Sequence, residues 1–473
     1  MERLKELAAQ HFGTDKCLET VPLPISGSNR KYYRIICKED RSSTTIGVIG
    51  TVPQENRAFI RMTEHFLKAG FPVPEIYAVD SSESHYLQQD LGDTSLFSLI
   101  DSGVCDQTLL EKCVRNLAAI QCIGSIGFDF DHWCYPVSDF DRRSIMFNLN
   151  YFEYSFLKLV LADFDECRLE DEFARLAGKL LAYNGNTFMY RDFQSRNIMI
   201  YCGNPYFIDY QGGRRGPLQY DIVSFLWQAR AGFSSELKKS LLGTYIDSLS
   251  EFRKTDRTAF EESTDLFVLF RTLQVLGAYG FRGLIERKSH FILSIMPALE
   301  NLKEITAMDV MREFPYLRTL LEALPEAYKE KYILFPEHHK GSLGVRVCSF
   351  SYRKGIPLDD TGNGGGYVFD CRGIPNPGRE PQYKSLTGLD APVIEYLEKS
   401  ELAMKFLEQV KLLTGRHIDR YLERGFTDLS IAFGCTGGQH RSVFCAQRVY
   451  EWIKENYPDI QVSLCHREQS IRL

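Results

Sequence analysis

The sequence predicts an α+β domain of two lobes over residues 1–335, followed by a smaller α/β domain with a mainly parallel sheet over residues 345–473. Three observations predict this fold class. The 473 residues exceed what one compact domain usually contains. In the first part of the chain, strand-like runs are followed by long helical stretches. In the last part, strands and helices alternate, which is typical of a parallel sheet.

The small lobe, residues 1 to about 94, is predicted to be built mainly from strands. Residues 31–39 and 43–51 are rich in β-branched and aromatic side chains, and residues 84–92 are strand-like again. Between them, residues 55–70 have apolar positions at helical spacing. This order predicts a sheet with one helix inserted into it.

The second lobe, residues of about 95–335, is predicted to be helical. Apolar residues recur at spacings of three and four in residues 107–121 and 152–164, and a long helix is predicted to include residues 265–284. A polar stretch near residue 190 interrupts the helices. It is the first candidate for a functional site.

A linker is predicted at residues 336–344, because a proline, paired histidines and two glycines occur in LFPEHHKGSLG. Beyond it, the pattern changes to alternating strands and helices. The predicted strands are 345–352, 366–373, 428–435 and 460–466, and the predicted helices are 392–424 and 441–456.

Composition limits the classes of function. The net charge is -6, and the part beyond residue 344 is nearly neutral, so charge does not favour a nucleic-acid partner. The 13 cysteines form no C-x-x-C pair, and the N-terminal residues resemble an amphipathic helix instead of a secretory segment. No apolar run is long enough to span a membrane. We therefore expect a cytoplasmic protein with reduced thiols.

The run YRDFQSRNIM places Asp192 five positions before Asn197, and Asp209 follows in FIDYQGG. Phosphoryl transfer from ATP needs a group that takes the proton of the acceptor hydroxyl, and oxygen ligands that hold Mg²⁺ on the phosphates. A loop with a carboxylate and a carboxamide, followed by a hairpin with a second carboxylate, can supply both. The structural alternative makes Asp192 a helix cap, Asn197 a turn residue and Asp209 a strand terminus.

These two motifs resemble those of the aminoglycoside phosphotransferase and choline kinase-like family, and the resemblance extends from residue 1 to about 330. It implies a bilobal protein-kinase-like fold with ATP in the cleft. It also implies that Asp192 is the catalytic base and that Asn197 and Asp209 are Mg²⁺ ligands.

Within that family, the sequence is most similar to cell-wall sugar kinases of the AmgK type, which phosphorylate the anomeric hydroxyl of N-acetylmuramate and N-acetylglucosamine. The segments that carry this likeness are LQQDLGD at 87–93, GPLQYDIVSFL at 216–226 and QVLGAYGFRG at 274–283. The resemblance implies that Gln89 and Asp90 take part in nucleotide binding.

The segment SGSNRKYYRI, residues 26–35, lies where kinase-like folds place a loop over the phosphates. Small residues let backbone N–H groups approach anionic oxygens, and basic side chains add charge. A simple turn between two strands is the alternative. The candidate nucleotide-binding residues here are Ser28, Asn29, Arg30, Lys31 and Arg34.

Two further positions bear on the kinase interpretation. Asp221, in YDIVSFL, is either a brace for the catalytic loop, as the family resemblance implies, or a helix N-cap. Kinase-like enzymes also carry a lysine on the third strand, paired with a helix glutamate, but TTIGVIGT at 44–51 has no basic residue. Glu55 is a candidate remnant of that helix partner. A catalytically inactive kinase relative therefore stays an alternative.

A second candidate site lies in GCTGGQHRSV, residues 434–443. Two glycines permit a tight loop before a predicted helix, whose N-terminus favours an anion, and Arg441 can bind phosphate oxygens in a bidentate manner. A phosphate or phosphosugar is the expected ligand. The alternatives are a solvated strand-to-helix turn, and a phosphatase-like nucleophile at Cys435.

Residues 345–468 resemble the C-terminal domain of RapZ, an RNase adapter protein that senses glucosamine-6-phosphate and binds small RNA. The matching segments are YVFDCRGIPNP, LTGLDAPVIEYLE, GCTGGQHRSV and CHRE. The family usually has a histidine after PNP, where this chain has Gly378. The nucleotide-binding half of RapZ is absent from the sequence. The resemblance implies a phosphosugar pocket lined by Thr436, Gly437, Gly438, His440, Arg441 and Ser442.

The leading hypothesis is therefore an ATP- and Mg²⁺-dependent sugar kinase, acting on an N-acetylhexosamine, with a C-terminal module that senses an amino-sugar phosphate. One alternative is an RNA-binding adapter with a degenerate nucleotide sensor, which the nearly neutral C-terminal charge disfavours. Another is an aminoglycoside phosphotransferase. The sequence predicts no membrane partner, and it leaves the oligomeric state and the phosphorylated hydroxyl open.

Overall fold

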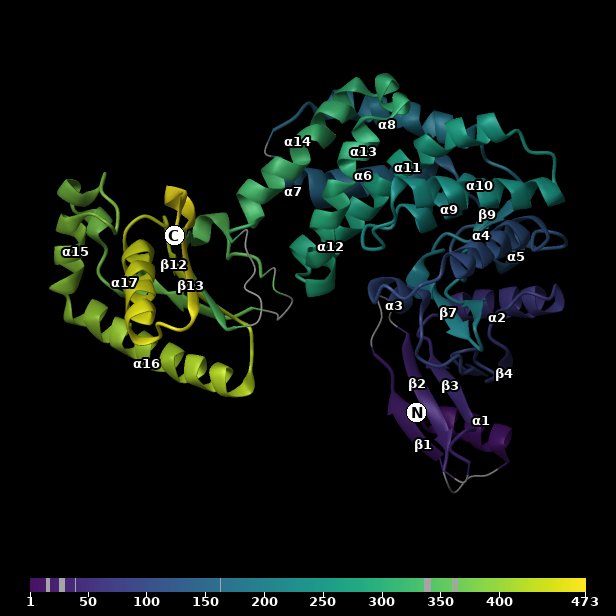
Figure 1. Ribbon diagram of the computed structural model, residues 1–473, viewed down its shortest axis with the longest axis horizontal. Coiled ribbons are helices and arrows are strands. Elements are labelled where there is room, and N and C mark those ends of the chain that lie inside the picture. The colour runs from purple at the N-terminus through teal and green to yellow at the C-terminus, as the bar shows by residue number, and fades with distance from the viewer. Residues whose placement is uncertain are drawn as a thin grey trace. The chain divides into compact units, whose positions relative to one another are not determined.

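The computed structural model describes residues 1–13, 18–24, 30–38, 40–161, 163–335, 342–359, 361 and 365–473. The chain divides into two compact units (Figure 1). The first comprises residues 1–154, 164–277 and 301–320, and the second comprises residues 155–163, 278–300 and 321–473. Residues 336–341 of the predicted linker lie outside the described residues. The domain boundary near residue 335 stays a prediction.

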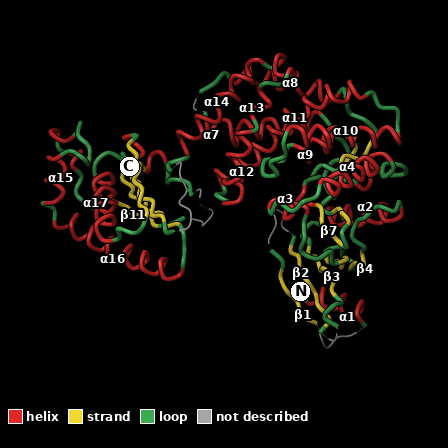
Figure 2. The backbone as a smooth tube through the Cα atoms, in the orientation of Figure 1, coloured by secondary structure: helices red, strands yellow, loops and turns green. Residues whose placement is uncertain are grey.

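The small lobe of the first unit is a five-stranded antiparallel sheet near the N-terminus (Figures 1 and 2). Its strands, in spatial order, are β1 (Leu18–Pro22), β2 (Lys31–Cys37), β3 (Thr44–Ile49), β5 (His85–Gln89) and β4 (Ile76–Val79).

One helix packs on each face of this sheet. On one face, α1 (Glu2–Phe12) buries Leu4 against Ile35 and Leu87. On the other, α2 (Pro53–Lys68) forms a core with Val48 and Tyr86. Because side chains alternate between the two faces of a strand, this arrangement fixes which residues of β2 and β3 face α2.

The second lobe of this unit is helical, as predicted. Several of its helices begin at an Asp or Ser whose side chain accepts a backbone N–H of the first turn, which satisfies a donor that the helix leaves unpaired. The helices wholly or mainly in this unit are α3 (Leu96–Asp101), α4 (Gln107–Cys122), α5 (Phe130–Trp133), α6 (Arg142–Phe152), α8 (Glu166–Leu181), α9 (Gln219–Leu226), α10 (Ser235–Phe252), α11 (Arg257–Tyr279) and α13 (Leu302–Thr306).

Two short antiparallel pairs interrupt the helices and carry the candidate site. In the first, β6 (Thr187–Met189) pairs with β9 (Arg214–Gly216). In the second, β7 (Ile198–Tyr201) pairs with β8 (Asn204–Phe207). The loop from 190 to 197 joins the two pairs, and it ends in the short 3-10 turn η2 (Ser195–Asn197).

The second unit contains a five-stranded sheet in the order β11-β12-β10-β13-β14. All pairings are parallel except that of the last strand, β14. The strands are β10 (Gly344–Ser351), β11 (Tyr367–Asp370), β12 (Asp428–Cys435), β13 (Gln461–His466) and β14 (Ile471–Arg472), and the helices mainly in this unit are α7 (Lys158–Val160), α12 (Ser289–Glu300), α14 (Pro315–Tyr332), α15 (Ala391–Glu398), α16 (Glu401–Arg424) and α17 (Arg441–Asn456).

The predicted fold class is confirmed: a mixed α+β part is followed by a small α/β part with a mainly parallel sheet. The single helix predicted at 392–424 is wrong in one respect, because it is broken into α15 and α16. The break has a local cause, since the Ser400 side chain accepts the Ala403 N–H and so starts a new helix. None of the helices within the described ranges has the length and hydrophobicity that a membrane crossing requires.

Candidate active site

The loop after β6 holds a strained backbone. Arg191 has a φ of 78°, a left-handed conformation that residues other than glycine adopt only when their surroundings enforce it. Here Asp221 enforces it, because its two carboxylate oxygens accept the backbone N–H groups of Tyr190 and Arg191, each at 2.7 Å. The hydroxyl of Tyr190 also donates to the carbonyl of Ile208.

Asp221 is fully buried, and burial raises its pKa to about 7. Its carboxylate accepts a third hydrogen bond from the side-chain amide of Gln121, at 2.8 Å. Because α9 begins at Gln219, Asp221 lies inside the first turn and not at the cap position, where Leu218 stands. Asp221 therefore holds the backbone at the start of the loop from 190 to 197, and it is not the N-cap of α9.

Asn197 connects the loop to Asp209. Its side-chain nitrogen donates to the backbone carbonyl of Asp192, at 2.8 Å, and to a carboxylate oxygen of Asp209, at 3.2 Å. The other oxygen of Asp209 accepts from Gln211, at 2.7 Å. The three residues that the sequence singled out therefore lie together, and both bonds of Asn197 use its nitrogen instead of its oxygen.

The electrostatics of this cluster favour a cation. Burial and, next, the negative charge of Asp192 raise the pKa of Asp209 above its ordinary value. Asp192 itself is only half-buried. Two carboxylates in one partly desolvated site are stabilised by a bound cation, and oxygen ligands of this kind suit Mg²⁺.

A cavity of about 390 Å³ lies beside the catalytic loop in the same unit. Arg191, Arg214 and Arg143 all contribute to its wall, together with Asn148, Tyr220 and Gln274. Burial and the charge of Arg191 lower the pKa of Arg214 to about 10, and the charge of Asp192 acts on Arg214 in the opposite direction. Since that value is well above neutral pH, the cavity has a positive wall next to Asp192.

The predicted nucleotide loop is only partly described, because Ser28 and Asn29 lie outside the described residues. Lys31 is exposed. Arg30 is buried, and its guanidinium lies 3.3 Å from the Glu55 carboxylate on α2. The two residues that the sequence suggested separately therefore form an ion pair.

Arg34 and Asp90, both predicted to bind nucleotide, contact each other. The Nε of Arg34 donates to Asp90 at 2.6 Å, and its terminal nitrogens donate to Asp93 at 2.9 and 3.0 Å. This pairing joins β2 to the segment after β5. The remaining predicted nucleotide-binding residue, Gln89, accepts the backbone N–H of Glu75 through its side chain, at 3.3 Å.

The glycine-rich loop of the second unit follows β12 and precedes α17. Thr436 and Gly437 are exposed, whereas Gly438 has a φ of 66° and is buried. The N–H of Gly438 donates to the Cys435 sulfur at 3.2 Å, and the Ser442 hydroxyl lies 3.1 Å from the same sulfur. The thiol is therefore part of the internal hydrogen bonding of the loop.

The two basic residues of this loop face a neighbouring segment. Arg441 donates to the backbone carbonyls of Arg372 and Ile374, at 3.0 and 3.2 Å. The ring of His440 is bonded to the carbonyl of Tyr383 at 2.8 Å. Gly378 lies beside His440, because a Cβ added there would come within 3.2 Å of the ring. Arg441 and His440 therefore contact the segment of residues 372–383. This segment contains Gly378, where the chain departs from the RapZ pattern.

Several supporting residues were missed by the sequence interpretation. Gln121 is 100 positions from Asp221, and no spacing rule connects them. Gln228 accepts the N–H and the hydroxyl of Ser195 through one oxygen, again from another element. Gln211 alone among these residues lies in a motif that predicts the site, because it follows Asp209 in FIDYQGG. In the second unit, Gln469 donates to the carbonyl of Gly438.

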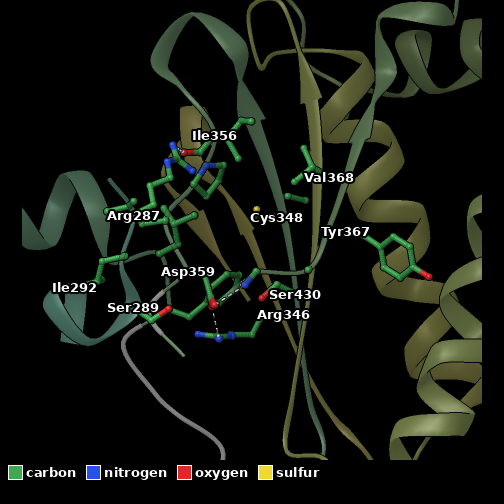
Figure 3. A pocket seen from close by; sticks show the side chains of 17 residues that line it. Arg287, Ser289, Ile292, Arg346, Cys348, Ile356, Asp359, Tyr367, Val368 and Ser430 are labelled. Atoms are coloured by element: carbon green, nitrogen blue, oxygen red, sulfur yellow. Dashed lines mark hydrogen bonds and ion pairs between the residues drawn. The ribbon is translucent and has the colours of Figure 1, made fainter. Parts of the chain in front are cut away.

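A further cavity of about 320 Å³ lies within the second unit (Figure 3). Arg346 is the buried cation of its wall, and it lies 3.8 Å from Asp359 and 3.9 Å from Asp428. Arg287 and Asp359 also line this cavity, so its described wall has one arginine more than its single carboxylate, whereas the cavity beside Asp192 has three arginines and no carboxylate among the described residues of its wall.

Comparison with known protein families identifies the class of each part of the chain. Residues 19–260 match the phosphotransferase enzyme family, and residues 343–470 match the RapZ C-terminal domain. The chain belongs to the phosphotransferase enzyme family, and it carries a RapZ C-terminal domain after it.

Curated relatives share parts of the chain. A nucleotide-binding protein of Acidobacterium capsulatum is 32% identical over 230 residues, which are 48% of this chain and 70% of the relative. One of Pseudoalteromonas translucida is 41% identical over 121 residues, which are 26% of this chain and 41% of the relative. For three of the curated relatives that it matches, including the one of Pseudoalteromonas translucida, the chain spans 40% to 48% of the relative's length.

Solved structures with some likeness include a choline kinase of Cryptosporidium parvum and an ethanolamine kinase of Plasmodium vivax. The first has 12% identity and a TM-score of 0.47, and the match covers 68% of this chain and 99% of that one. The second has 13% identity and a TM-score of 0.45, and the match covers 62% and 86%.

Proposed function

We propose that this protein is an ATP- and Mg²⁺-dependent kinase that phosphorylates a hydroxyl of an N-acetylhexosamine, and that its C-terminal part binds an amino-sugar phosphate. One observation carries the proposal: Asp192, Asn197 and Asp209 lie in one hydrogen-bonded cluster beside a cavity with a positive wall. The likeness of the sequence to cell-wall sugar kinases of the AmgK type supports the choice of sugar.

The donor set of the cluster fits Mg²⁺. Asp209 and the side-chain oxygen of Asn197 would hold the ion, because hard divalent cations prefer carboxylate and amide oxygens. The raised pKa of Asp209 is consistent with this role, since repulsion from Asp192 is what a cation would relieve. When bound, Mg²⁺ would neutralise charge on the transferring phosphoryl group.

Asp192 is proposed as the general base. It accepts the proton of the acceptor hydroxyl, the acceptor oxygen forms a bond to the γ-phosphorus, and the bond from that phosphorus to the leaving oxygen of ADP breaks. Asp221 contributes by holding the backbone on the N-terminal side of Asp192, and Asn197 by bonding the Asp192 carbonyl. Positioning of this kind is most of what a phosphoryl-transfer enzyme has to provide.

The cavity wall favours an anionic acceptor over a cationic one. Arg143, Arg191 and Arg214 would attract the carboxylate of an acidic sugar such as N-acetylmuramate and would repel the ammonium groups of an aminoglycoside. Neutral polar side chains, including Asn148 and Gln274, are available for sugar hydroxyls. The aminoglycoside alternative is therefore the less favoured one.

For the second unit, we propose that the loop from Thr436 to Ser442 binds the phosphate of a hexosamine phosphate. The exposed Thr436 and Gly437 and the N-terminus of α17 support this role, since helix N-termini favour anions. The ligand would act as an effector, which is the sensing role that the likeness to the RapZ C-terminal domain implies.

The experiment is an ATP-consumption screen of the full chain against N-acetylmuramate, N-acetylglucosamine, choline and an aminoglycoside, with and without Mg²⁺. We expect Mg²⁺-dependent turnover with the acetylated sugars and a higher kcat/KM for N-acetylmuramate. N-acetylglucosamine is the matched control, because it lacks the carboxylate. Turnover confined to choline or the aminoglycoside, or none with any acceptor, would contradict the proposal.

A further inference from the structure

The third strand of the small lobe has no cation where kinase-like enzymes carry a lysine. The strand register shows what stands there instead. Val48 on β3 is paired with Tyr32 on β2 and with Tyr86 on β5, so these three side chains form one row across the α2-facing side of the sheet. Ile46 faces the same side. Ile46 and Val48, the two positions of β3 at which a lysine would face α2, are therefore both apolar.

A cation reaches this region from the neighbouring strand. Arg30 immediately precedes β2 and is two residues from Tyr32, so its side chain is on the same, α2-facing side. That side chain is only 4% exposed, and one terminal nitrogen lies 3.3 Å from a carboxylate oxygen of Glu55. Glu55 belongs to the first turn of α2. An ion pair between the sheet and this helix thus exists without a third-strand lysine.

The helix that carries Glu55 also contacts the segment that carries the proposed metal ligand. Phe59 of α2 stacks on Tyr210, the residue after Asp209, and the Thr63 hydroxyl of α2 is hydrogen-bonded to the Tyr210 hydroxyl. Arg30 therefore pairs with a helix that packs directly against the neighbour of Asp209.

The other cations of the segment are less suited to the same task. Arg34 is on the same side of β2, but its guanidinium is bonded to both Asp90 and Asp93. Lys31 is the next residue along the strand, so its side chain points to the opposite side, and it is exposed. Of the three basic residues that the sequence suggested, Arg30 has the required burial and partner.

We infer that Arg30, oriented by Glu55, takes the place of the missing third-strand lysine and binds the phosphates of the nucleotide. This inference rests on the proposed kinase function and names the protein group that holds the phosphate charge. An arginine suits a position one strand away, because its side chain is long and its planar guanidinium can hold a carboxylate and still present N–H groups to phosphate oxygens. It also gives Glu55 a definite role, that of a positioning residue.

The test compares binding of a non-hydrolysable ATP analogue with binding of adenosine, both in the presence of Mg²⁺, for the full chain. The variants are Arg30→Ala, Arg30→Gln, Arg30→Lys and Glu55→Gln. The matched control is Lys38→Ala, which removes an exposed cation directly after β2. We expect Arg30→Ala and Arg30→Gln to weaken binding of the analogue by about tenfold or more, as for loss of a charge-assisted contact, and to leave adenosine binding unchanged. Arg30→Lys should retain part of the affinity, and Glu55→Gln should have a smaller effect.

A purely structural role predicts a different result. Equal weakening of analogue and adenosine binding, or unchanged analogue binding in a folded Arg30→Gln variant, would overturn the inference. The readout does not depend on turnover, so the two proposals can fail separately. A protein that binds the analogue through Arg30 but phosphorylates no sugar would refute only the proposed function. An active kinase that is indifferent to Arg30 would refute only this inference.

Discussion

The two loops that carry the proposed sites are built in different ways. The catalytic loop is held by buried side chains from distant elements: Asp221 lies 31 positions from Tyr190, and Gln121 lies 100 positions from Asp221. The glycine-rich loop is held partly from within, because the Cys435 sulfur contacts groups three and seven positions ahead, and partly by Gln469, which donates to the Gly438 carbonyl. We therefore expect side-chain substitutions to matter most in the first loop, and backbone substitutions in the second.

The largest effect is expected at the centre of the catalytic loop. Asp192→Asn should lower kcat by about a hundredfold or more, because the variant keeps the shape of the side chain and loses its ability to accept the acceptor proton. Binding of ATP should change little. Steady-state kinetics and a nucleotide titration measure the two effects, with Asp171→Asn, an exposed carboxylate on α8, as the control. Full activity in Asp192→Asn would show that Asp192 is not the general base.

The second effect concerns the brace. Asp221→Asn places an amide against the N–H groups of Tyr190 and Arg191, so one of these buried donors loses its acceptor. We expect a loss of about 1–3 kcal/mol in the free energy of unfolding, as for other buried groups left unpaired, together with reduced turnover. Denaturant unfolding of the full chain measures the first, and the kinetic assay measures the second. Unaltered stability and turnover would show that the loop keeps its geometry without the brace.

The wild-type protein and Asp221→Asn should also differ in how their free energy of unfolding depends on pH. The unfolded chain releases the Asp221 proton near the ordinary pKa of 3.8, whereas the folded chain holds it until about pH 7. Between these values the folded state binds more protons, so this group makes wild-type stability fall as the pH rises through 7. Asp221→Asn lacks the titration. The stability difference between wild type and variant should therefore shrink from pH 5 to pH 8, and a constant difference would contradict the raised pKa.

Local spacing explains how much of the catalytic site could be predicted. Asp192, Asn197 and Asp209 lie within 18 residues of one another, on a loop and a hairpin, so their proximity follows from the chain alone. The ion pair of Arg30 with Glu55 depends on how α2 packs on the sheet, and the Arg34–Asp90 pair depends on the order of β2, β3 and β5. Neither arrangement can be derived from spacing, because both are tertiary.

The fold was predictable to a similar extent. The β-branched and aromatic side chains of residues 31–39 and 43–51, and the strand-like residues 84–92, identified the three strands that are central in the sheet. The short edge strands β1 and β4 were not predicted, since they bury few residues and have little periodic signal. In the second unit, the sequence identified Arg441 as a phosphate ligand, whereas the structure engages its guanidinium with two backbone carbonyls. These two hydrogen bonds depend on a segment that lies 69 and 67 residues before Arg441 in the chain, so local spacing does not predict them.

The next effect compares two adjacent glycines of the second loop. A Cβ at Gly438 would lie 2.4 Å from the Glu468 side chain and 2.9 Å from the Ser351 nitrogen, and the φ of 66° disfavours other residues. Gly437 has no atom within 4 Å of an added Cβ. We expect Gly438→Ala to destabilise the protein by about 1–3 kcal/mol, and Gly437→Ala to leave stability nearly unchanged.

Ligand binding should separate the same two variants. If the loop approaches a phosphate through its backbone, the methyl group of Gly437→Ala should weaken binding of glucosamine-6-phosphate without lowering the melting temperature of the free protein. A thermal-shift series with glucosamine-6-phosphate, glucosamine and inorganic phosphate measures both effects, because a ligand of the folded state stabilises it. Equal responses to glucosamine and its phosphate would exclude a phosphate site in this loop.

The smallest effect is expected where this chain departs from the RapZ pattern. Gly378 stands where that family usually has a histidine, and an added Cβ there would come within 3.2 Å of the His440 ring. Because His440 is anchored to the Tyr383 carbonyl, its ring cannot move away from the new side chain without losing that hydrogen bond. We expect Gly378→His to raise the affinity for glucosamine-6-phosphate by about two- to fivefold, the range of one added hydrogen bond of modest net strength. Gly378→Ala is the matched control, since it introduces the Cβ without the imidazole, and isothermal titration of the full chain measures the affinity. If both variants weaken binding equally, the glycine serves to leave space beside His440, and the ligand of this protein differs from that of the family.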